Sequence, residues 1–317
     1  MAVKRVRSML QEEIETTNPG NPDVSNGPAP NDVQYLTVSD ELSLVAYYLS
    51  QLVRLCKSFK MPTHVESTAM TYLKRFYLRN TCMDYHPKNI MLTCLFLATK
   101  TENHTISIDT FTSKIPRCIP QDVLSLEFLV AQSIKFQFKV HHADLAGKGI
   151  MLDMQTLLDS EEAVTHLVTA TYPQSLAQIM LLRLTDAEFL YTPSQIALAA
   201  FYNSDPSLTE RWLSAKLSLA ERSILRQASE SAIAVDRLVE STVDPLVSLV
   251  TEAKQAVDIE AVREVDKRLK YCNNPEKDPK SSLFKKREIE KEETEERKRE
   301  KKMETKKKED GEEDPFA

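Results

Sequence analysis

Tyr85-x-Pro87-x-x-Ile90-x-Leu92 returns 106 residues later in the chain as Tyr191-x-Pro193-x-x-Ile196-x-Leu198. In both copies proline stands where a helix would begin, a position at which its missing N–H costs nothing. The apolar run that follows is too continuous for a surface helix and is typical of a helix that is buried on all sides. The chain therefore contains two copies of a unit of roughly 100 residues, and each central helix needs a shell of other helices around it.

Composition supports two helical domains and argues against a cofactor site. A chain of 317 residues holds about two domains. It has five glycines, of which only Gly147 and Gly149 lie between residues 28 and 310, so the glycine-rich loops that bind nucleotide phosphates are not expected. His141 and His142 have no cysteine or carboxylate at metal-ligand spacing, which favours a polar junction over a metal site. We expect no cofactor and no metal.

The cysteines and the hydropathy pattern predict a soluble, intracellular protein. The five cysteines are odd in number, lack C-x-x-C spacing and lie mostly in apolar helical runs, which favours reduced core residues. No apolar stretch approaches the roughly 20 residues of a membrane span, and the N-terminus lacks a signal-peptide core. The cysteines are Cys56, Cys82, Cys94, Cys118 and Cys272.

The order of the helical patterns divides the chain into five parts. We expect a short amphipathic helix and a linker over residues 1–38, a first repeat over 39–140, a second repeat over 141–250, a C-terminal helix within 251–274, and a charged tail over 275–317. The tail is either disordered or a solvated helix. The predicted fold class is all-α, with two tandem five-helix units between terminal helices.

Helix boundaries follow from capping residues and prolines. The first helix is expected to begin at a Ser39 or Asp40 cap and to bury Leu42. Thr192 and Gln195 have the spacing of a capping box at the start of the central helix of the second repeat. The other helices are expected to begin at about residues 62, 87, 107, 120, 144, 173, 208 and 219, and those from 173 and 219 to end at about 189 and 243.

Charge differs between the two repeats. Residues 40–140 carry 12 Lys and Arg against 8 Asp and Glu, whereas residues 141–250 carry 7 against 14. A protein that gripped DNA with both repeats should be basic in both, because phosphate neutralisation supplies most of such affinity. We therefore expect no direct binding to nucleic acid. In the tail, 22 of the residues 285–310 are charged, and the clusters 285–287 and 297–299 fit either a nuclear import signal or a solvated charge run.

Five helices wrapped around a central one, present twice, resemble the cyclin box. The cyclin family binds its kinase through a Lys at the end of the third helix and a Glu on the fifth. Here Leu97-Ala98-Thr99-Lys100-Thr101-Glu102 looks like the family's L-A-x-K-x-E element, and Leu126-Glu127-Phe128-Leu129 looks like its x-E-x-L element. The resemblance implies that Lys100 and Glu127 form the kinase-binding pair.

Within the family, the similarity is to the cyclin H branch and covers about residues 32–272. It rests on Lys74-Arg75-Phe76-Tyr77-Leu78, Ile90-Met91-Leu92-Thr93-Cys94 and above all Leu190-Tyr191-Thr192-Pro193-Ser194-Gln195-Ile196-Ala197-Leu198. This branch implies a non-catalytic subunit that activates a cyclin-dependent kinase, forming the CDK-activating kinase with a RING-finger assembly factor and joining transcription factor IIH in the nucleus. The segment before the linker is short for this branch, and the first helix lacks the M-R-A-I-L-like patch and the Trp with which other cyclins dock substrates, so no such docking is expected.

The residue types of the pair suit the binding of main-chain groups. An ammonium offers donors and a carboxylate offers acceptors, so together they can hold C=O and N–H groups of a partner helix. The alternative is that Lys100 is a helix-end cation favoured by the dipole and Glu127 a solvated residue. Structural roles are also favoured for residues outside the pair: core packing for Tyr72, Phe76, Tyr77 and Trp212, and a solvated basic face for Lys74, Arg75 and Arg79.

Two other hypotheses remain open from the sequence. The chain could be another transcription-associated cyclin of the cyclin C type, which the accompanying kinase would distinguish. It could instead be a IIB-type basal transcription factor that binds DNA, although the acidic second repeat and the lack of Cys or His before Cys56 for a zinc ribbon disfavour it. An enzyme is the least favoured class, because no nucleophile, base and orienting group can be assembled from the motifs.

Overall fold

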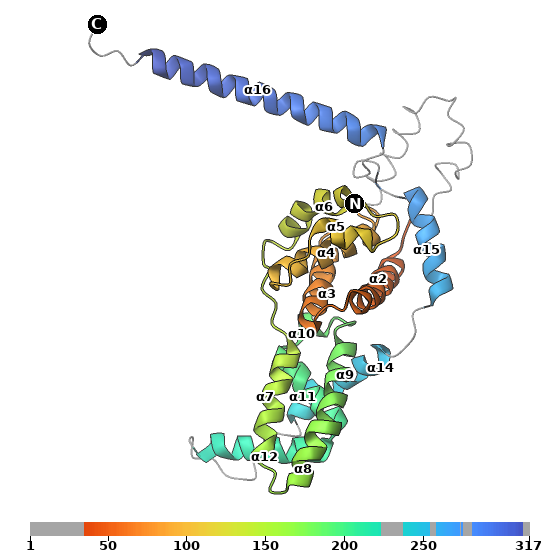
Figure 1. Cartoon of the computed structure of the whole chain (residues 1–317), viewed down its shortest axis with the longest axis vertical. Helices are drawn as coiled ribbons and strands as arrows, with labels where there is room; N and C mark the ends of the chain where they lie inside the picture. The colour runs from red at the N-terminus through yellow and green to blue at the C-terminus, as the bar shows by residue number, and fades with distance from the viewer. Residues whose placement is uncertain (1–34, 223–236, 254–257, 273, 275–280, 313–317) are drawn as a thin grey trace. The chain divides into compact units, whose positions relative to one another are not determined.

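The computed structural model describes residues 35–222, 237–253, 258–272, 274 and 281–312 (Figure 1). Within these ranges the chain forms helices and connecting turns without a β-strand, which confirms the predicted all-α class. The amphipathic helix predicted near the N-terminus lies outside the described residues. The elements are α2 (Val38–Phe59), α3 (Thr63–Tyr77), α4 (Pro87–Thr101), α5 (Ile108–Ser113), α6 (Pro120–Ser133), α7 (Ala143–Gln155), α8 (Glu161–His166), the π-turn η1 (Leu167–Thr171), α9 (Tyr172–Leu182), α10 (Ala187–Leu190), α11 (Pro193–Ser204), α12 (Pro206–Arg222), the π-turn η2 (Val239–Val243), α14 (Asp244–Ala253), α15 (Ile259–Cys272) and α16 (Ser282–Glu312).

Contacts divide the chain into two compact parts. The larger part contains residues 45–79 and 88–259, and the smaller part contains the chain up to residue 44, residues 80–87 and the chain from residue 260 onward. Both repeated motifs supply a central helix to the larger part, namely α4 and α11.

The helix α4 is the core of the first repeat, as its continuous apolar run predicts. Every residue from Ile90 to Thr99 is buried. Its Phe96 ring lies 5.4 Å from the ring of Phe111 on α5, and its Thr93 hydroxyl donates to the Val123 carbonyl of α6 at 3.4 Å. Only the two ends of α4 reach the surface, which leaves its last turn available for a partner.

The helix α11 has the same place in the second repeat. Residues 196–201 are all buried, and α11 packs against α7, α9, α12 and α14. The predicted capping box is confirmed: the Gln195 N–H donates to the Thr192 hydroxyl at 3.4 Å, and the Thr192 N–H donates to Gln195 Oε1 at 2.9 Å. Proline at the first helical position therefore starts the central helix of both repeats.

Two helices of the second repeat pass through prolines at which helix boundaries were expected. The helix that begins at Glu161 runs through η1 and Pro173 to Leu182, and the helix that contains η2 runs through Pro245 to Ala253. The proline ring clashes with the carbonyl four residues back, and a π-turn just before the proline widens the helix there. The predicted helix over 173–189 was therefore wrong at both ends.

The start of α2 also differs from the sequence prediction. Thr37 is the capping residue: its hydroxyl accepts from the Asp40 N–H at 3.2 Å, while Asp40 Oδ2 accepts from the Thr37 N–H at 2.9 Å. The reciprocal bonds place the cap before Ser39, contrary to prediction. Leu42 is exposed, and Leu44 is buried in its stead.

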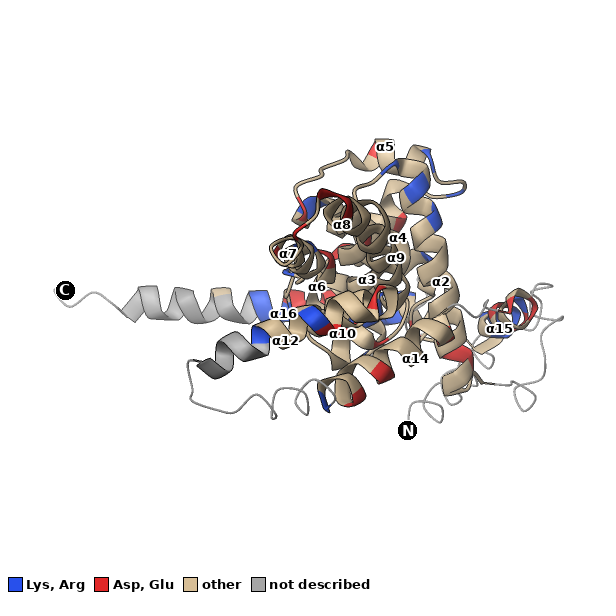
Figure 2. Cartoon of the chain, turned by 90° about the horizontal axis from the view of Figure 1, so that it is seen from below, with Lys and Arg blue, Asp and Glu red and all other residues tan. Residues whose placement is uncertain are grey.

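The smaller part is built around α15 and residues 80–87. Val262, Val265 and Leu269 are buried along one face of α15, as predicted. The opposite face carries charges of both signs (Figure 2). Arg268 of α15 pairs with Asp40 of α2 at 2.9 Å. Asn274, two residues after α15, donates its N–H to the Met83 carbonyl at 2.8 Å and so holds the segment that precedes α4.

The tail forms the helix α16, in which Arg299 lies 3.7 Å from Glu295 one turn earlier. The described side chains of residues 285–299 are exposed. None of the described helices combines the length and the apolarity needed to cross a membrane.

The cysteines are free thiols, and all except the partly exposed Cys118 are buried. Burial raises the pKa of the Cys56 thiol to about 12, which keeps it protonated. The predicted placement of the cysteines in the core is confirmed for the four buried ones.

The two glycines of α7 provide a matched stability test. A Cβ at Gly149 would meet no atom within 4 Å, whereas a Cβ at Gly147 would lie 3.2 Å from Ile179 Cδ1. Gly149→Ala is therefore expected to raise the free energy of unfolding by about 0.5–1 kcal/mol, because Ala restricts the unfolded chain. Gly147→Ala should give a smaller gain or a loss, since Ile179 must move. Urea denaturation measures both, and equal gains would contradict the packing at α7.

Candidate functional site

Lys100 lies in the last turn of α4, where the helix emerges from the core. Its side chain is 39% exposed, and its Nζ lies 4.5 Å from the centroid of the Phe96 ring. The ring face attracts the ammonium. The buried body of α4 thus holds Lys100, one of the two exposed lysines of this helix, at a fixed position.

Glu127 lies on α6 and forms a direct ion pair and hydrogen bond with Lys100. The sequence-predicted pair is therefore brought together in space, although 26 other residues separate the two along the chain. The Glu127 side chain is 23% exposed. An ammonium has three protons and a carboxylate several acceptor positions, so each group can bind a partner while the internal contact remains.

Two exposed apolar side chains of α6 are close to Glu127 along the helix. Leu124 precedes Glu127 by three residues and Phe128 directly follows it, and Phe128 is 69% exposed. The Phe128 ring lies 6.0 Å from the ring of Phe136, which is also exposed. A charged pair beside exposed aromatic side chains has the composition of a protein-binding surface.

The structural roles expected for several aromatic residues are confirmed. Tyr72 and Phe76 are fully buried, while Tyr77 is partly buried. Trp212 packs against the core of the second repeat, and its indole N–H donates to Asp153 at 2.9 Å.

Lys74 corrects the sequence prediction of a solvated basic face. Its side chain is 5% exposed and reaches from α3 to the α9–α10 turn of the second repeat. There Nζ donates to the carbonyls of Arg183 and Thr185 at 2.9 Å each and pairs with Glu188 at 2.9 Å. Spacing alone could not reveal these partners, because they lie more than 100 positions away. Arg79 is exposed as expected.

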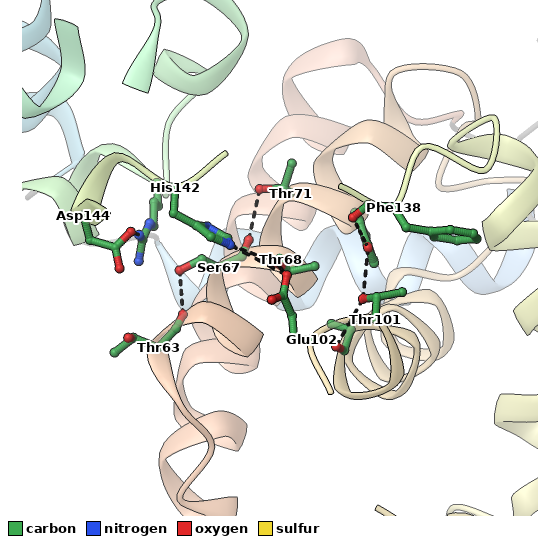
Figure 3. Close-up of polar contacts among 12 residues, drawn as sticks. Thr63, Ser67, Thr68, Thr71, Thr101, Glu102, Phe138, His142 and Asp144 are labelled. Carbon is green, nitrogen blue, oxygen red and sulfur yellow. Dashed lines mark hydrogen bonds and ion pairs between the residues drawn. The ribbon is translucent and has the colours of Figure 1, made fainter. Parts of the chain in front are cut away.

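A second polar group joins the repeats through Thr68 of α3 (Figure 3). Its hydroxyl donates to Glu102 Oε1 at 2.6 Å and lies 3.2 Å from His142 Nε2. The sequence predicted a polar junction at His142 but did not identify Thr68 or Glu102. The signal that could have found them is the run of hydroxyl residues Ser67, Thr68 and Thr71 inside a helix with buried neighbours, where such side chains need partners.

His142 is held in its neutral form. Burial lowers the pKa of this imidazole, and the nearby Arg183 guanidinium lowers it further, against the opposing effect of Asp144, Glu102 and Glu188. Folding therefore disfavours protonation of His142. At pH values just below the usual pKa of histidine, the unfolded chain binds more protons than the folded chain does.

Stability is accordingly expected to fall as the pH drops through and below about 6.5, the usual pKa of an unfolded histidine. His142→Gln should flatten this dependence by at most about 1.4 kcal/mol per pH unit, the limit for one proton. His141→Gln is the matched control, because His141 is the exposed neighbour. Urea denaturation between pH 7 and pH 5 measures the slopes, and equal slopes for wild type and His142→Gln would contradict the lowered pKa.

Comparison with known proteins identifies the family. The profile "Cyclin, N-terminal domain" matches residues 28–139, and the profile "Cyclin C-terminal domain" matches residues 145–262. The chain is 34% identical over 261 residues to Cyclin mcs2 of Schizosaccharomyces pombe, covering 82% of this chain and 74% of that protein. The chain belongs to the cyclin family. The two repeats are therefore cyclin boxes, as the resemblance implied.

Two further cyclins are similar to this chain. The chain is 35% identical over 188 residues to Cyclin CCL1 of Saccharomyces cerevisiae, covering 59% of this cyclin and 47% of that one. It is 32% identical over 188 residues to Cyclin-H of Xenopus laevis, covering 56% of each.

Two solved complexes contain chains similar to this cyclin. A chain of the CAK complex of Chaetomium thermophilum bound to ATP-gamma-S matches with a TM-score of 0.66 at 27% identity, over 92% of this cyclin and 86% of that chain. A chain of the yeast TFIIK complex, Kin28/Ccl1/Tfb3, matches with a TM-score of 0.54 at 30% identity, over 69% of this cyclin and 87% of that chain.

Proposed function

We propose that this cyclin is a cyclin H-like regulatory subunit that binds and activates a cyclin-dependent kinase and performs no chemistry of its own. The observation that carries the proposal is the Lys100–Glu127 ion pair between α4 and α6, with the exposed apolar side chains Leu124 and Phe128 on α6. The similarity to a chain of the CAK complex over 92% of this cyclin supports the choice of branch. The proposed limits of the two boxes are residues 39–140 and 141–250.

The geometry suits the capture of one helix of a kinase. The αC helix of a kinase carries a Glu that must meet the β3 Lys before ATP is aligned. Lys100 can donate to main-chain carbonyls at the end of such a helix, and Glu127 can accept from main-chain N–H groups of the preceding loop. Phe128 and Leu124 add apolar contact area beside them. Because α4 is buried along its length, the pair is positioned before binding, which lowers the entropy cost of association.

The proposed complex is the CDK-activating kinase, with a RING-finger assembly factor as its third subunit and transcription factor IIH as its larger assembly. The yeast TFIIK complex also has three components, Kin28, Ccl1 and Tfb3, which supports an assembly of this size. Its substrates would be the activation loops of cell-cycle kinases and the C-terminal repeats of RNA polymerase II. We place the complex in the nucleus. The basic clusters 285–287 and 297–299 of α16 have the composition of a nuclear import signal.

Purification of the tagged full-length chain from its own cells, followed by mass spectrometry, tests this assignment. We expect a cyclin-dependent kinase and a RING-finger protein in stoichiometric amounts. Recovery of a different transcription-associated kinase would favour the cyclin C alternative. The proposed mechanism of kinase binding would then be unchanged. Recovery without any kinase would contradict the proposal.

A further inference from the structure

Two hydroxyls of α3 join the end of α4 to the segment between the boxes. Thr68 and Tyr72 lie one helical turn apart. Thr68 Oγ1 contacts Glu102 and His142 (Figure 3). The Tyr72 hydroxyl lies 3.1 Å from Thr101 Oγ1 and 2.5 Å from the Phe138 carbonyl. Each hydroxyl thus lies between the last residues of α4 and residues 138–142.

The direction of the hydrogen bonds at Thr68 follows from proton counting. A threonine hydroxyl has one proton, and the 2.6 Å contact gives that proton to the Glu102 carboxylate. His142 Nε2 at 3.2 Å must therefore carry the hydrogen and donate to Thr68 Oγ1. His142 Nδ1 is then the bare nitrogen, and it is buried without a partner among the described residues. The sequence of donors runs from His142 through Thr68 to Glu102.

Glu102 directly follows α4 and is its C-terminal capping residue. The Glu102 N–H donates to the Ala98 carbonyl at 3.0 Å, and the His104 N–H donates to the Thr99 carbonyl at 2.8 Å. Asn103 has a φ of 55°. These features form a Schellman-type helix end in which Lys100 lies two residues before the cap. Movement of Glu102 would therefore change the last turn that presents Lys100.

The same connecting segment also contacts the neighbour of Glu127 on α6. Phe136 packs on Phe128, which directly follows Glu127, and the rings of Phe136 and Phe138 are 6.3 Å apart. Residues 136–142 therefore contact α3, which holds the end of α4 near Lys100, through His142. Through Phe136 they also contact Phe128, the neighbour of Glu127 on α6.

We propose that Thr68 is a positioning residue for kinase binding, which fixes the end of α4 through Glu102 and couples it to His142 at the start of the second box. The inference rests on the proposed role of Lys100 and Glu127. Thr68 does not touch the kinase. It acts by restricting the Lys100 ammonium to the position that the partner requires.

Thr68→Val tests the inference, because valine keeps the shape and removes the hydroxyl. The measured quantity is the affinity of the full-length chain for the cyclin-dependent kinase that co-purifies with it. We expect a loss of about tenfold, as for a hydrogen bond to a charged group. Thr71→Val is the matched control: the same substitution one turn along α3 removes a hydroxyl bonded to Glu188 at 3.1 Å instead of Glu102. Its affinity should stay within about twofold of wild type, with thermal melting recorded for both variants.

A double-mutant cycle separates positioning from a general structural effect. If Thr68 acts through Lys100, Thr68→Val should cost little further affinity in a Lys100→Ala background. Lys100→Arg replaces Lys100→Ala if binding becomes too weak to measure. A full additive loss in that background, or equal losses for Thr68→Val and Thr71→Val, would overturn the inference while leaving the kinase-binding role of Lys100 intact. No loss from Lys100→Ala itself would overturn the proposed function and the inference together.

Discussion

Lys100→Glu combined with Glu127→Lys is expected to abolish kinase activation while leaving the fold intact. The exchange keeps an ion pair between α4 and α6, so thermal melting should change little. It places an acceptor where the partner requires a donor, and a donor where it requires an acceptor. Loss of two hydrogen bonds to charged groups, at about 1.5–3 kcal/mol each, should raise the half-maximal cyclin concentration at least about a hundredfold. Kinase activity titrated with each cyclin measures the shift.

A charge exchange elsewhere on the surface serves as the control. Arg211 lies 4.0 Å from Asp159 in the second box, and both side chains are exposed. Arg211→Asp with Asp159→Arg should leave kinase activation unchanged. If the exchange at Lys100 and Glu127 also leaves activation unchanged, the pair does not bind the kinase.

Lys74→Met is expected to cause the largest loss of stability among the three basic positions Lys74, Arg75 and Arg79. Met keeps the length of the side chain but cannot donate to the carbonyls of Arg183 and Thr185 or neutralise Glu188. Breaking a buried pair on one side costs about 3–5 kcal/mol, because the other charge stays buried without its partner. Urea denaturation of the full-length chain should show a loss of this size.

Two further variants identify the cause of that loss. Adding Glu188→Gln to Lys74→Met should restore part of the stability, because the unpaired carboxylate is removed. Arg79→Met, on the exposed part of the same basic cluster, should change the free energy of unfolding by less than about 0.5 kcal/mol. A loss for Lys74→Met as small as the one for Arg79→Met would mean that Lys74 is solvated, as the sequence predicted.

The parts of the fold that the sequence predicted well are those decided by local chemistry. The start of α4 agrees with prediction because Pro87 begins the helix, and its burial agrees because the apolar run is unbroken. The capping box of Thr192 and Gln195 likewise needs only residues three apart. The pairing of Lys100 with Glu127 could not be predicted from local chemistry. From spacing alone, Lys100 could equally be a helix-end cation and Glu127 a solvated residue. The prediction that these two residues form a pair came from the resemblance to the cyclin box.

The parts that the sequence missed depend on partners far along the chain or on competition within a helix. Lys74 looked like one member of an exposed basic cluster until folding brought the α9–α10 turn over it. Pro173 looked like a helix start, because a proline with a π-turn before it has no separate signature in the sequence. Thr68 was missed because the hydroxyl residues of α3 indicate a need for polar partners but not which carboxylate each of them will meet.

The most direct measurement is the rate at which the co-purified kinase phosphorylates a peptide from the RNA polymerase II C-terminal repeats, with and without this cyclin. Kinase stripped of its subunits is titrated with the purified full-length chain at fixed ATP and peptide. We expect a saturable rise in rate that the Lys100→Glu, Glu127→Lys variant fails to produce. A rate that stays at the level of the kinase alone across the wild-type titration would contradict the assignment of this chain as a kinase-activating cyclin.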